Sequence, residues 1–414
     1  MAGAEQPHQS SQVIPRRATT LVVFVTTVVQ ALATLCTLVP AAIAPELARA
    51  FGVPASMIGY QVSLVYSGAI VTSMVGGVLI RRLGALRTSQ VALAFAGLGL
   101  ALSAAPSMIA IAIGSVLVGF GYGLTNPAAS HLLMRVSKPQ NRNFIFSLKQ
   151  TGVPLGAVCA GLASPSLVLM EGWQEAFLIL AATPLIVIIL IQPLRSRWDR
   201  DRNPAEPLRQ NPTNDLGLIW RHPALRLISF SAFCFSAVQI SLSAFAVTML
   251  VEDLAFGLVQ AGIVLSVLQV AGVIGRVSWG GVADWLHDAN RVLSIVALTA
   301  ASAGLMTMFL EPGVGIALVI AVLCLFGVSA IGWNGVFLAE IARLAPDGQV
   351  SNATGGAMVP TYTGVVIGPA TFAALHVLTG HYTATFGIFA AVSLTGFALV
   401  LAARRFSGST KTGD

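Results

Sequence analysis

The sequence predicts an all-helical membrane protein with twelve transmembrane helices in two related six-helix bundles. Of its 414 residues, 56% are hydrophobic and 9% are charged, whereas a soluble domain carries roughly 25% charged residues. A chain in lipid must satisfy its backbone polar groups internally, which leaves helix bundles or closed barrels. The apolar runs here are about 20 residues long and do not alternate, so helices are predicted.

Twelve apolar runs between polar breaks define the predicted helices. Those of the first half are 19–44, 58–80, 88–105, 108–134, 144–169 and 174–194. The main breaks among them are, in order, Glu46 to Arg49, Arg81 to Arg87, Arg135 to Arg142 and Glu171 to Glu175. Those of the second half are 225–250, 260–284, 291–310, 313–341, 355–378 and 383–403. The corresponding breaks are Glu252 with Asp253, Asp284 to Arg291, Glu311, Arg343 and the glycine turn at 380.

The positive charges indicate which side of the membrane each loop faces. The 23 Lys and Arg residues fall almost wholly in alternate loops, and only Arg49 falls in an intervening loop. By the positive-inside rule, both termini and the 195–222 loop are expected in the cytoplasm, with the chain in the inner (plasma) membrane. The net charge of +7 is therefore a topology signal, and it gives little weight to nucleic-acid binding.

Sequence features recur between the two halves at offsets of about 205–212 residues. The matching pairs are "GGV" at 76–78 and 280–282, Asn126 with Arg135 and Asn334 with Arg343, "GVPLG" at 152–156 and "GVVIG" at 364–368, and "GWQEAF" at 172–177 and "GHYTATF" at 380–386. Four matches in the same order indicate parallel repeats, an arrangement of transporters that bind substrate between the repeats.

The repeats predict a five-part organisation of the chain. Two bundles are separated by a linker rich in arginine, acidic residues and proline, and each end carries a short cytoplasmic tail. The predicted parts are the tail 1–18, the bundle 19–194, the linker 195–222, the bundle 223–404 and the tail 405–414.

A motif after the second helix carries a resemblance to a known family. The segment "GVLIRRLGALR" at 77–87 is similar to G-x-x-x-D-R-x-G-R-R, the cytoplasmic signature of the major facilitator superfamily. Gly77, Arg82 and Gly84 match it, while Arg81 stands where the aspartate belongs. The resemblance covers all twelve helices and implies a transporter whose two halves are clamped together on the cytoplasmic side by such loops.

The related segment after the eighth helix, "WGGVADWLHD", keeps Gly280 and the acidic residue Asp284. A carboxylate can bind the N-terminus of a neighbouring helix. The family's pseudo-symmetry implies that Asp284 lies beside the start of the fifth helix, near Arg142 and Asn143. Arg81 cannot act in the same way, so only one of the two clamps is expected to be intact.

Arg276 is the most informative charged residue, because it lies about 12 Å deeper along its helix than Asp284. A charge at that depth costs at least ~2.5–3.5 kcal/mol on insertion scales, so it should face a cavity or a partner. One interpretation is a structural hydrogen bond to neighbouring carbonyls. The other is an anion site, since a guanidinium binds a carboxylate through two parallel hydrogen bonds. The pattern Arg276-x-x-x-Gly280 also resembles the anion-contacting helix of monocarboxylate transporters, of the oxalate–formate exchanger and of related organic-anion and cyanate-permease-like branches.

Lys149 lies about 8 Å inside the cytoplasmic end of the fifth helix. Its side chain could extend to the membrane interface, as lysines near helix ends do. However, Gln150 and Thr151 follow it, and three polar residues in one turn cover too wide an arc to face lipid. Lys149 and Gln150 are therefore candidates for the same cavity as Arg276. Pro154, in the same helix, is expected to free a backbone carbonyl and to kink the helix.

Other polar or amphipathic residues within the spans are weaker candidates for substrate contacts, and a helix–helix hydrogen bond explains each of them better than a ligand contact does. They are Gln30, Tyr66, Asn126, Gln239, Gln269, Trp333, Asn334 and Tyr362. Three titratable residues are possible proton carriers, namely His131, Glu340 and His376. No Asp or Glu lies near the middle of a predicted span, so a proton, if one moves, is expected to travel with the substrate.

The sequence contains no phosphate loop, metal-ligand spacing or nucleophile with a base, so neither an enzyme nor a cofactor is predicted. The hypothesis is a secondary transporter that moves a small organic anion, acts as a monomer and carries a proton only optionally. Arg276 and Lys149 would bind the anion, and Asp284 would close the cytoplasmic gate. One alternative is an exporter of lipophilic or cationic drugs, which predicts an intramembrane acid. A remoter alternative is a membrane sensor that does not transport.

Overall fold

The computed structural model describes residues 16–53, 55–205 and 214–407, and these residues form helices without strands. The two predicted tails lie almost wholly outside the described residues. The helices of the first half and the linker are α1 Arg16–Ala42, α2 Ala44–Phe51, α3 Ala55–Ser73, α4 Gly76–Leu83, α5 Ala85–Leu102, α6 Met108–Val136, η1 Pro139–Asn141, α7 Arg142–Gln150, α8 Gly152–Glu171, α9 Trp173–Ile191, η2 Gln192–Leu194, α10 Arg195–Trp198 and α11 Asn214–Arg221. Those of the second half are α12 Pro223–Thr248, η3 Met249–Asp253, α13 Leu258–Leu286, α14 Ala289–Thr307, α15 Ile316–Ala330, α16 Asn334–Leu344, α17 Val350–Thr379 and α18 Tyr382–Ser407.

Each of the twelve predicted spans corresponds to a helix or to a pair of helices joined end to end. Among the described residues, eleven stretches are long and apolar enough to cross a membrane. The remaining span, the second along the chain, consists of α3 and α4, which are bent by 58° where they meet. The fold class predicted from the sequence is therefore confirmed, but the second helix is not continuous as expected.

The bend between α3 and α4 directly follows two hydroxyls that bond back to their own helix. The hydroxyls of Thr72 and Ser73 donate back to the carbonyls of Gly68 and Ala69, and such bonds weaken and bend a helix. Beyond the bend, α4 begins with a glycine pair, and a Cβ at Gly76 would lie 3.2 Å from Pro127. The bend and the small side chains together let α4 lie close against its neighbours.

Two further spans are interrupted at positions that line the centre of the molecule. The fifth span is divided at Thr151 into α7 and α8, and the tenth is divided at residues 331–333 into α15 and α16. Half-helices of this kind leave backbone carbonyls without their usual donors, and such groups can instead bind side chains or ligands.

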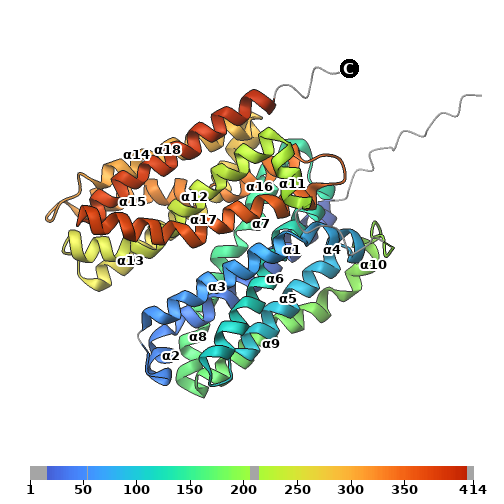
Figure 1. Ribbon diagram of the computed structural model, residues 1–414, viewed down its shortest axis with the longest axis horizontal. Helices are drawn as coiled ribbons and strands as arrows, with labels where there is room; N and C mark the ends of the chain where they lie inside the picture. Colours follow the sequence, from blue (N-terminus) through green and yellow to red (C-terminus); the bar gives the residue numbers. More distant parts are fainter. Residues whose placement is uncertain (1–15, 54, 206–213, 408–414) are drawn as a thin grey trace, which may run out of the picture.

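The helices form two bundles that touch each other mainly at one end (Figure 1). Between the bundles, α7 packs against α13 and α16, and α17 packs against α3, α4 and α6. One apolar core contains residues of both halves at this end, from Val22 and Phe146 to Phe337 and Ala353. The other two cores belong to a single half each.

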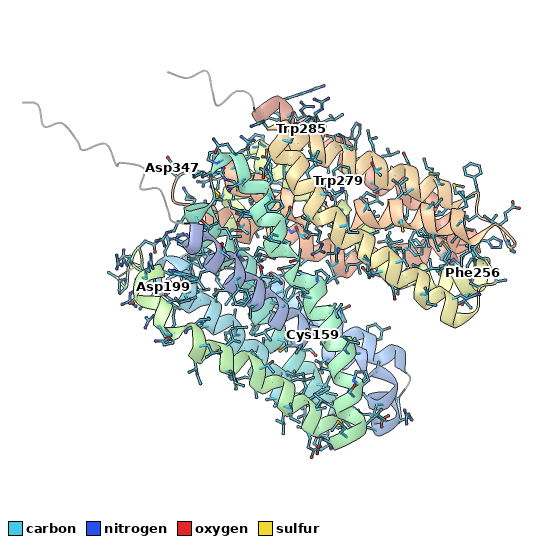
Figure 2. The ribbon with its side chains drawn as sticks, turned by 180° about the vertical axis from the view of Figure 1, so that it is seen from behind. Cys159, Asp199, Phe256, Trp279, Trp285 and Asp347 are labelled. Atoms are coloured by element: carbon cyan, nitrogen blue, oxygen red, sulfur yellow. The ribbon has the colours of Figure 1, made fainter. Side chains whose placement is uncertain are left out.

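The shared core defines what we name the closed end, and the separate cores define the open end. Asp199 and Asp347 lie at the closed end, whereas Phe256 lies at the opposite end of the second half (Figure 2). The helix α13 runs from one end to the other, and its Trp285 is 77% exposed near the closed end. The two halves are therefore in contact at one end and separate at the other.

Candidate functional site

A cavity of about 580 Å³ lies between the two halves, lined by α1, α3, α6, α7, α8, α12, α13, α16 and α17. Nine of the candidates from the sequence line it: Tyr66, Asn126, Gln150, Gln239, Gln269, Arg276, Trp333, Asn334 and Tyr362. Lining residues such as Val158 and Val270 are more than half exposed, so the cavity is reached from the open end. The structure therefore brings together residues that are far apart in the sequence.

Arg276 bridges the two halves at the floor of this cavity. Its Nε donates to the carbonyl of Ile331, 3.0 Å away in the break between α15 and α16. Its Nη1 donates to the carbonyl of Gln150, 2.7 Å away at the end of α7 in the first half. The side chain is only 2% exposed. The guanidinium thus makes the carbonyl hydrogen bonds of the first interpretation and also lines the cavity. The anion site stays a prediction.

Lys149 points into the protein and not toward the membrane interface. Its Nζ donates to Gln30 Oε1 at 2.8 Å, Asn126 Oδ1 at 2.7 Å and Gln150 Oε1 at 3.1 Å. All three donors of the ammonium group are thus used, and the side chain is 1% exposed. Lys149 does not line the cavity itself. It lies directly behind Asn126 and Gln150, which do.

The two cations have no acidic partner among the described residues. The acceptors of both are neutral amide or peptide oxygens, and the residues that line the cavity include no Asp or Glu. Gln150 contacts both cations, through its side-chain oxygen to Lys149 and through its carbonyl to Arg276. A buried positive charge without a counter-ion favours binding of an anion.

Aromatic rings surround the same space. Tyr66 and Tyr122 of the first half and Tyr362 of the second pack with ring centroids 5.5–5.9 Å apart. The Nδ2 of Asn126 donates to the hydroxyl of Tyr362 at 3.3 Å. Because Tyr122 and Tyr362 also belong to the core of the closed end, the tyrosines separate the cavity from that end.

Sequence reasoning missed Tyr122, and it gave Gln239 little weight. Tyr122 lies four residues before Asn126 in α6 and therefore on the same helix face, a spacing that could have identified it. Gln239 Oε1 accepts hydrogen bonds from Trp333 Nε1 and Asn334 Nδ2, both at 3.0 Å. Its role depends on contacts between α12 and α16 that the sequence does not show.

At the closed end, Asp284 binds the start of α7. Its carboxylate accepts from the backbone N–H groups of Asn143 and Phe144 at 3.0 and 2.8 Å, and from the Asn143 side chain at 2.9 Å. This is the position that the resemblance implied. Arg142, the first residue of α7, lies next to these contacts and is half-buried.

Glycines make this contact between the halves possible. A Cβ at Gly280 of α13 would lie 2.5 Å from Ser147 Oγ and 2.9 Å from the Asn143 carbonyl oxygen. Gly335 of α16 meets Ser147 from the other side, with its Cβ position 2.2 Å from Ser147 Cα. The helix α7 is thus held between α13 and α16 by close backbone contacts.

Arg81 does not bind a helix N-terminus as Asp284 does, but it still connects the two halves. Its Nη1 donates to the side-chain oxygen of Asn352, near the start of α17 in the second half. A Cβ at Gly77 would lie 2.5 Å from the same asparagine. Arg81 and Asp284 thus occupy related places, but the basic side chain donates to an asparagine where the acidic one accepts from backbone. Arg82 follows in α4 and is half-buried.

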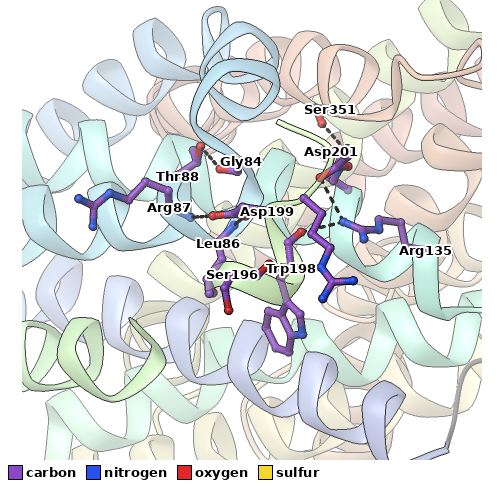
Figure 3. A network of polar contacts seen from close by, with 12 residues as sticks. Gly84, Leu86, Arg87, Thr88, Arg135, Ser196, Trp198, Asp199, Asp201 and Ser351 are labelled. Atoms are coloured by element: carbon purple, nitrogen blue, oxygen red, sulfur yellow. Dashed lines mark hydrogen bonds and ion pairs between the residues drawn. The ribbon is translucent and has the colours of Figure 1, made fainter. Parts of the chain in front are cut away.

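The linker attaches to the first half beside Gly84 (Figure 3). Asp199, 4% exposed, accepts from the N–H groups of Leu86 and Arg87 at 2.8 and 3.0 Å and so caps α5. Gly84 has a φ of 94°, and a Cβ there would lie 2.2 Å from the Asp199 carboxyl carbon. Burial raises the pKa of Asp199 above its ordinary value, although the two N–H donors act in the opposite direction.

A second linker residue, Asp201, forms an ion pair with His131 of α6. Asp201 Oδ2 lies 2.7 Å from His131 Nε2, and Arg135 Nη1 lies 3.3 Å from its other oxygen. The hydrogen bond with His131 is the main cause that lowers the pKa of Asp201. On its far side, His131 Nδ1 lies 3.2 Å from the hydroxyl of Ser351 in the second half. His131 thus joins the linker and both halves at the closed end, outside the cavity.

The other two candidate proton carriers also lie away from the cavity lining. Glu340 is buried and accepts two hydrogen bonds from Arg343 at 2.6 and 2.7 Å and one from Asn290 at 2.9 Å. The ring of His376 stacks on Tyr382 with centroids 3.8 Å apart, near the far end of α17. Neither Glu340 nor His376 therefore lines the central cavity.

The sequence family described as the Major Facilitator Superfamily matches residues 23–358. The chain belongs to this family of membrane transporters. The resemblance inferred from the motifs at 77–87 and 279–288 is thereby confirmed.

Comparisons with individual proteins agree with this family. The chain is 26% identical over 313 residues to an uncharacterized MFS-type transporter of Mycobacterium tuberculosis, which covers 73% of this chain and 66% of that protein. It is 26% identical over 267 residues to the 3-(3-hydroxy-phenyl)propionate transporter of Escherichia coli, covering 62% and 63%. The matches thus span less than two thirds of either relative. The crystal structure of the MFS transporter FucP in the outward conformation superposes with a TM-score of 0.75 at 18% identity, covering 94% of this chain and 99% of that one.

Proposed function

We propose that this protein is a secondary transporter that moves a small organic anion, a carboxylate, across the membrane by alternating access. The observation that carries the proposal is the pair of buried cations at the cavity, Arg276 and Lys149, whose bound partners are all neutral oxygens. A carboxylate would supply the charge that this site lacks.

The proposed contacts follow from the geometry. Two of the five guanidinium N–H groups of Arg276 donate to carbonyls. A carboxylate that binds through two parallel hydrogen bonds can take the place of one of these neutral acceptors. Lys149 adds positive potential from behind Asn126 and Gln150. The tyrosine rings suit a flat, apolar substrate body, and the name of the Escherichia coli relative describes an aromatic acid. We therefore favour an aromatic carboxylate.

The proposed transport cycle moves the 19–194 and 223–404 bundles relative to each other, with 195–222 as the linker. With both termini in the cytoplasm, as the positive charges predict, the open end faces outward. Gly77, Arg82, Gly84, Gly280, Asp284 and Arg142 then belong to the cytoplasmic gate. A proton could accompany the anion, but the positions of His131, Glu340 and His376 give no support to a path through them. One chain holds the complete cavity, which supports a monomer.

The two alternatives have less support. Export of lipophilic cations predicts an acidic residue in the cavity, and the described lining contains none. A sensor that does not transport would need a segment that passes on a signal. The linker instead binds the transporter's own helices through Asp199 and Asp201.

A ligand-induced thermal shift on the purified protein tests the proposal. The panel would contain benzoate, hydroxybenzoates, aliphatic mono- and dicarboxylates, inorganic anions including cyanate, and lipophilic cations. We expect an aromatic carboxylate to raise the melting temperature of the wild type but not of Arg276→Gln, since stabilisation grows as RT ln(1 + [L]/Kd). The control is Arg291→Gln, which removes the same charge at the start of α14. Equal stabilisation of all three proteins by lipophilic cations would refute the proposal in favour of drug efflux.

A further inference from the structure

The bond between Arg276 and Gln150 depends on a proline four residues further along the chain. In a continuous helix, the carbonyl of Gln150 would accept from the N–H of residue 154. Residue 154 is proline and has no N–H. The carbonyl therefore lacks its donor within the helix, and it accepts a hydrogen bond of 2.7 Å from the guanidinium of Arg276.

This bond joins the two halves directly at the substrate cavity. Gln150 ends α7 in the first half, and Arg276 lies in α13 of the second. On its other side, Arg276 is anchored within its own half by the carbonyl of Ile331. The guanidinium thus connects two interrupted helices, one from each half. Pro154 also lines the cavity beside it.

We propose that the substrate anion and the Gln150 carbonyl compete for the guanidinium of Arg276, so that binding of the anion breaks this bond between the halves. The inference rests on the proposed function. A guanidinium binds a carboxylate more strongly than a neutral carbonyl, because both partners are charged. The empty protein is then held in the open-ended conformation by the bond, and the loaded protein is released from it. Pro154 is the positioning residue, since it keeps the carbonyl from being used inside the helix.

Restoring the missing N–H tests the competition. In Pro154→Ala, the N–H of residue 154 can bond to the Gln150 carbonyl within the helix, so the bond to Arg276 weakens. We expect the anion identified by thermal shift to bind this variant three- to tenfold more tightly than the wild type in titration calorimetry. Pro154→Ser restores the same N–H and serves as a second variant if the first does not fold. A gain of affinity is a result that damage to the structure would not produce.

A second readout follows the conformation of the empty protein. Spin labels at Met170 and Phe309, both at least 75% exposed at the open end, report the distance between the halves in a cysteine-free background. We expect saturating anion to shift the distance distribution of the wild type. Empty Pro154→Ala is expected to show that shifted distribution already. The bond that the anion would break is weakened in this variant from the start.

Pro165→Ala is the matched control, because it removes the other proline within α8. Because Pro165 has no N–H, the carbonyl that lacks its helical donor is that of Gly161. An added Cβ at Gly161 would meet nothing within 4 Å. This variant should behave as the wild type in both measurements. If an anion needs Arg276 but binds wild type and Pro154→Ala equally, the competition is refuted and the proposed function stands. If no anion stabilises the wild type, the proposed function itself fails, and this inference fails with it.

Discussion

At the scale of single residues, the candidate site places positive charge among neutral oxygens. Lys149 satisfies its three donors with amide oxygens from α1, α6 and α7. These dipoles replace the hydrogen bonds of water, but they do not cancel the charge. The same holds for Arg276 and its two carbonyls. A site of this kind is kept folded by hydrogen bonds, yet no acidic residue among the described ones neutralises its charge.

The contribution of Lys149 can be measured with a neutral side chain of similar length. Lys149→Met should weaken binding of the anion by about tenfold, which corresponds to about 1.4 kcal/mol. The reason is that the positive potential at the cavity falls while Arg276 is still present. Titration calorimetry on the purified variant gives the affinity. Lys138→Met removes the same charge near the end of α6 and should leave the affinity unchanged. An unaltered affinity in Lys149→Met would show that Lys149 is only structural.

The sequence predicted the types of residue at the site better than their contacts. Arg276 and Lys149 stood out because charges within an apolar run are costly. Pro154 predicted a freed carbonyl in the fifth helix, but the sequence could not show that Arg276 of another span binds it. The Ile331 carbonyl was unpredictable, because the break at 331–333 has no such signal. Tyr122 was missed because a tyrosine in a glycine-rich helix has no distinctive signal until its helix face is compared with that of Asn126.

At the scale of helices, the runs of apolar residues predicted all twelve spans. What they could not predict were the interruptions at Met74 and Val75, at Thr151 and at 331–333. Hydropathy is averaged over a whole span, so a local break leaves it unchanged. The reversed contact of Arg81 with Asn352 was unpredictable for a related reason, because its partner lies 271 residues away.

The close contact between α7 and α13 predicts a conformational effect of one added side chain. Gly280→Val should push the two helices apart, because its Cβ would lie within 2.5–2.9 Å of Ser147 and Asn143. We expect the closed end to open, seen as a longer distance between spin labels on α4 and α11. Gly281→Val is the control, since a Cβ there meets nothing within 4 Å. If both variants gave the distances of the wild type, this contact would not hold the closed end.

At the scale of the whole molecule, the linker is part of the closed end. Asp199 caps a helix of the first half, and Asp201 holds His131, whose ring also reaches Ser351 of the second half (Figure 3). The charge pattern predicts a linker over 195–222. It could not show that the linker's acids bind helices, because a run of alternating charges looks the same when it is only solvated.

Acid should weaken this attachment of the linker. The pKa of Asp201 is lowered in the folded protein, so its stabilising contribution is present above the ordinary value of about 3.9 and is lost as the pH falls through the lowered one. Asp201→Asn should therefore melt about 1–3 °C below the wild type at pH 7. The two proteins should converge as the pH falls below the lowered pKa of Asp201. Asp347→Asn, at an exposed loop position, is the control. If the difference in melting temperature between Asp201→Asn and the wild type did not change with pH, this explanation would be contradicted.

The cap that Asp199 places on α5 also has a consequence for the order in which the protein is made. The N-terminus of α5 leaves the ribosome more than 100 residues before its capping carboxylate, so the first half is not complete until the linker has been synthesised. A gene divided between Ala205 and Asn214 would leave the cap with the first fragment. A gene divided before Arg195 would give it to the second. We expect two co-expressed fragments to reassemble into a working transporter more efficiently after the first division than after the second.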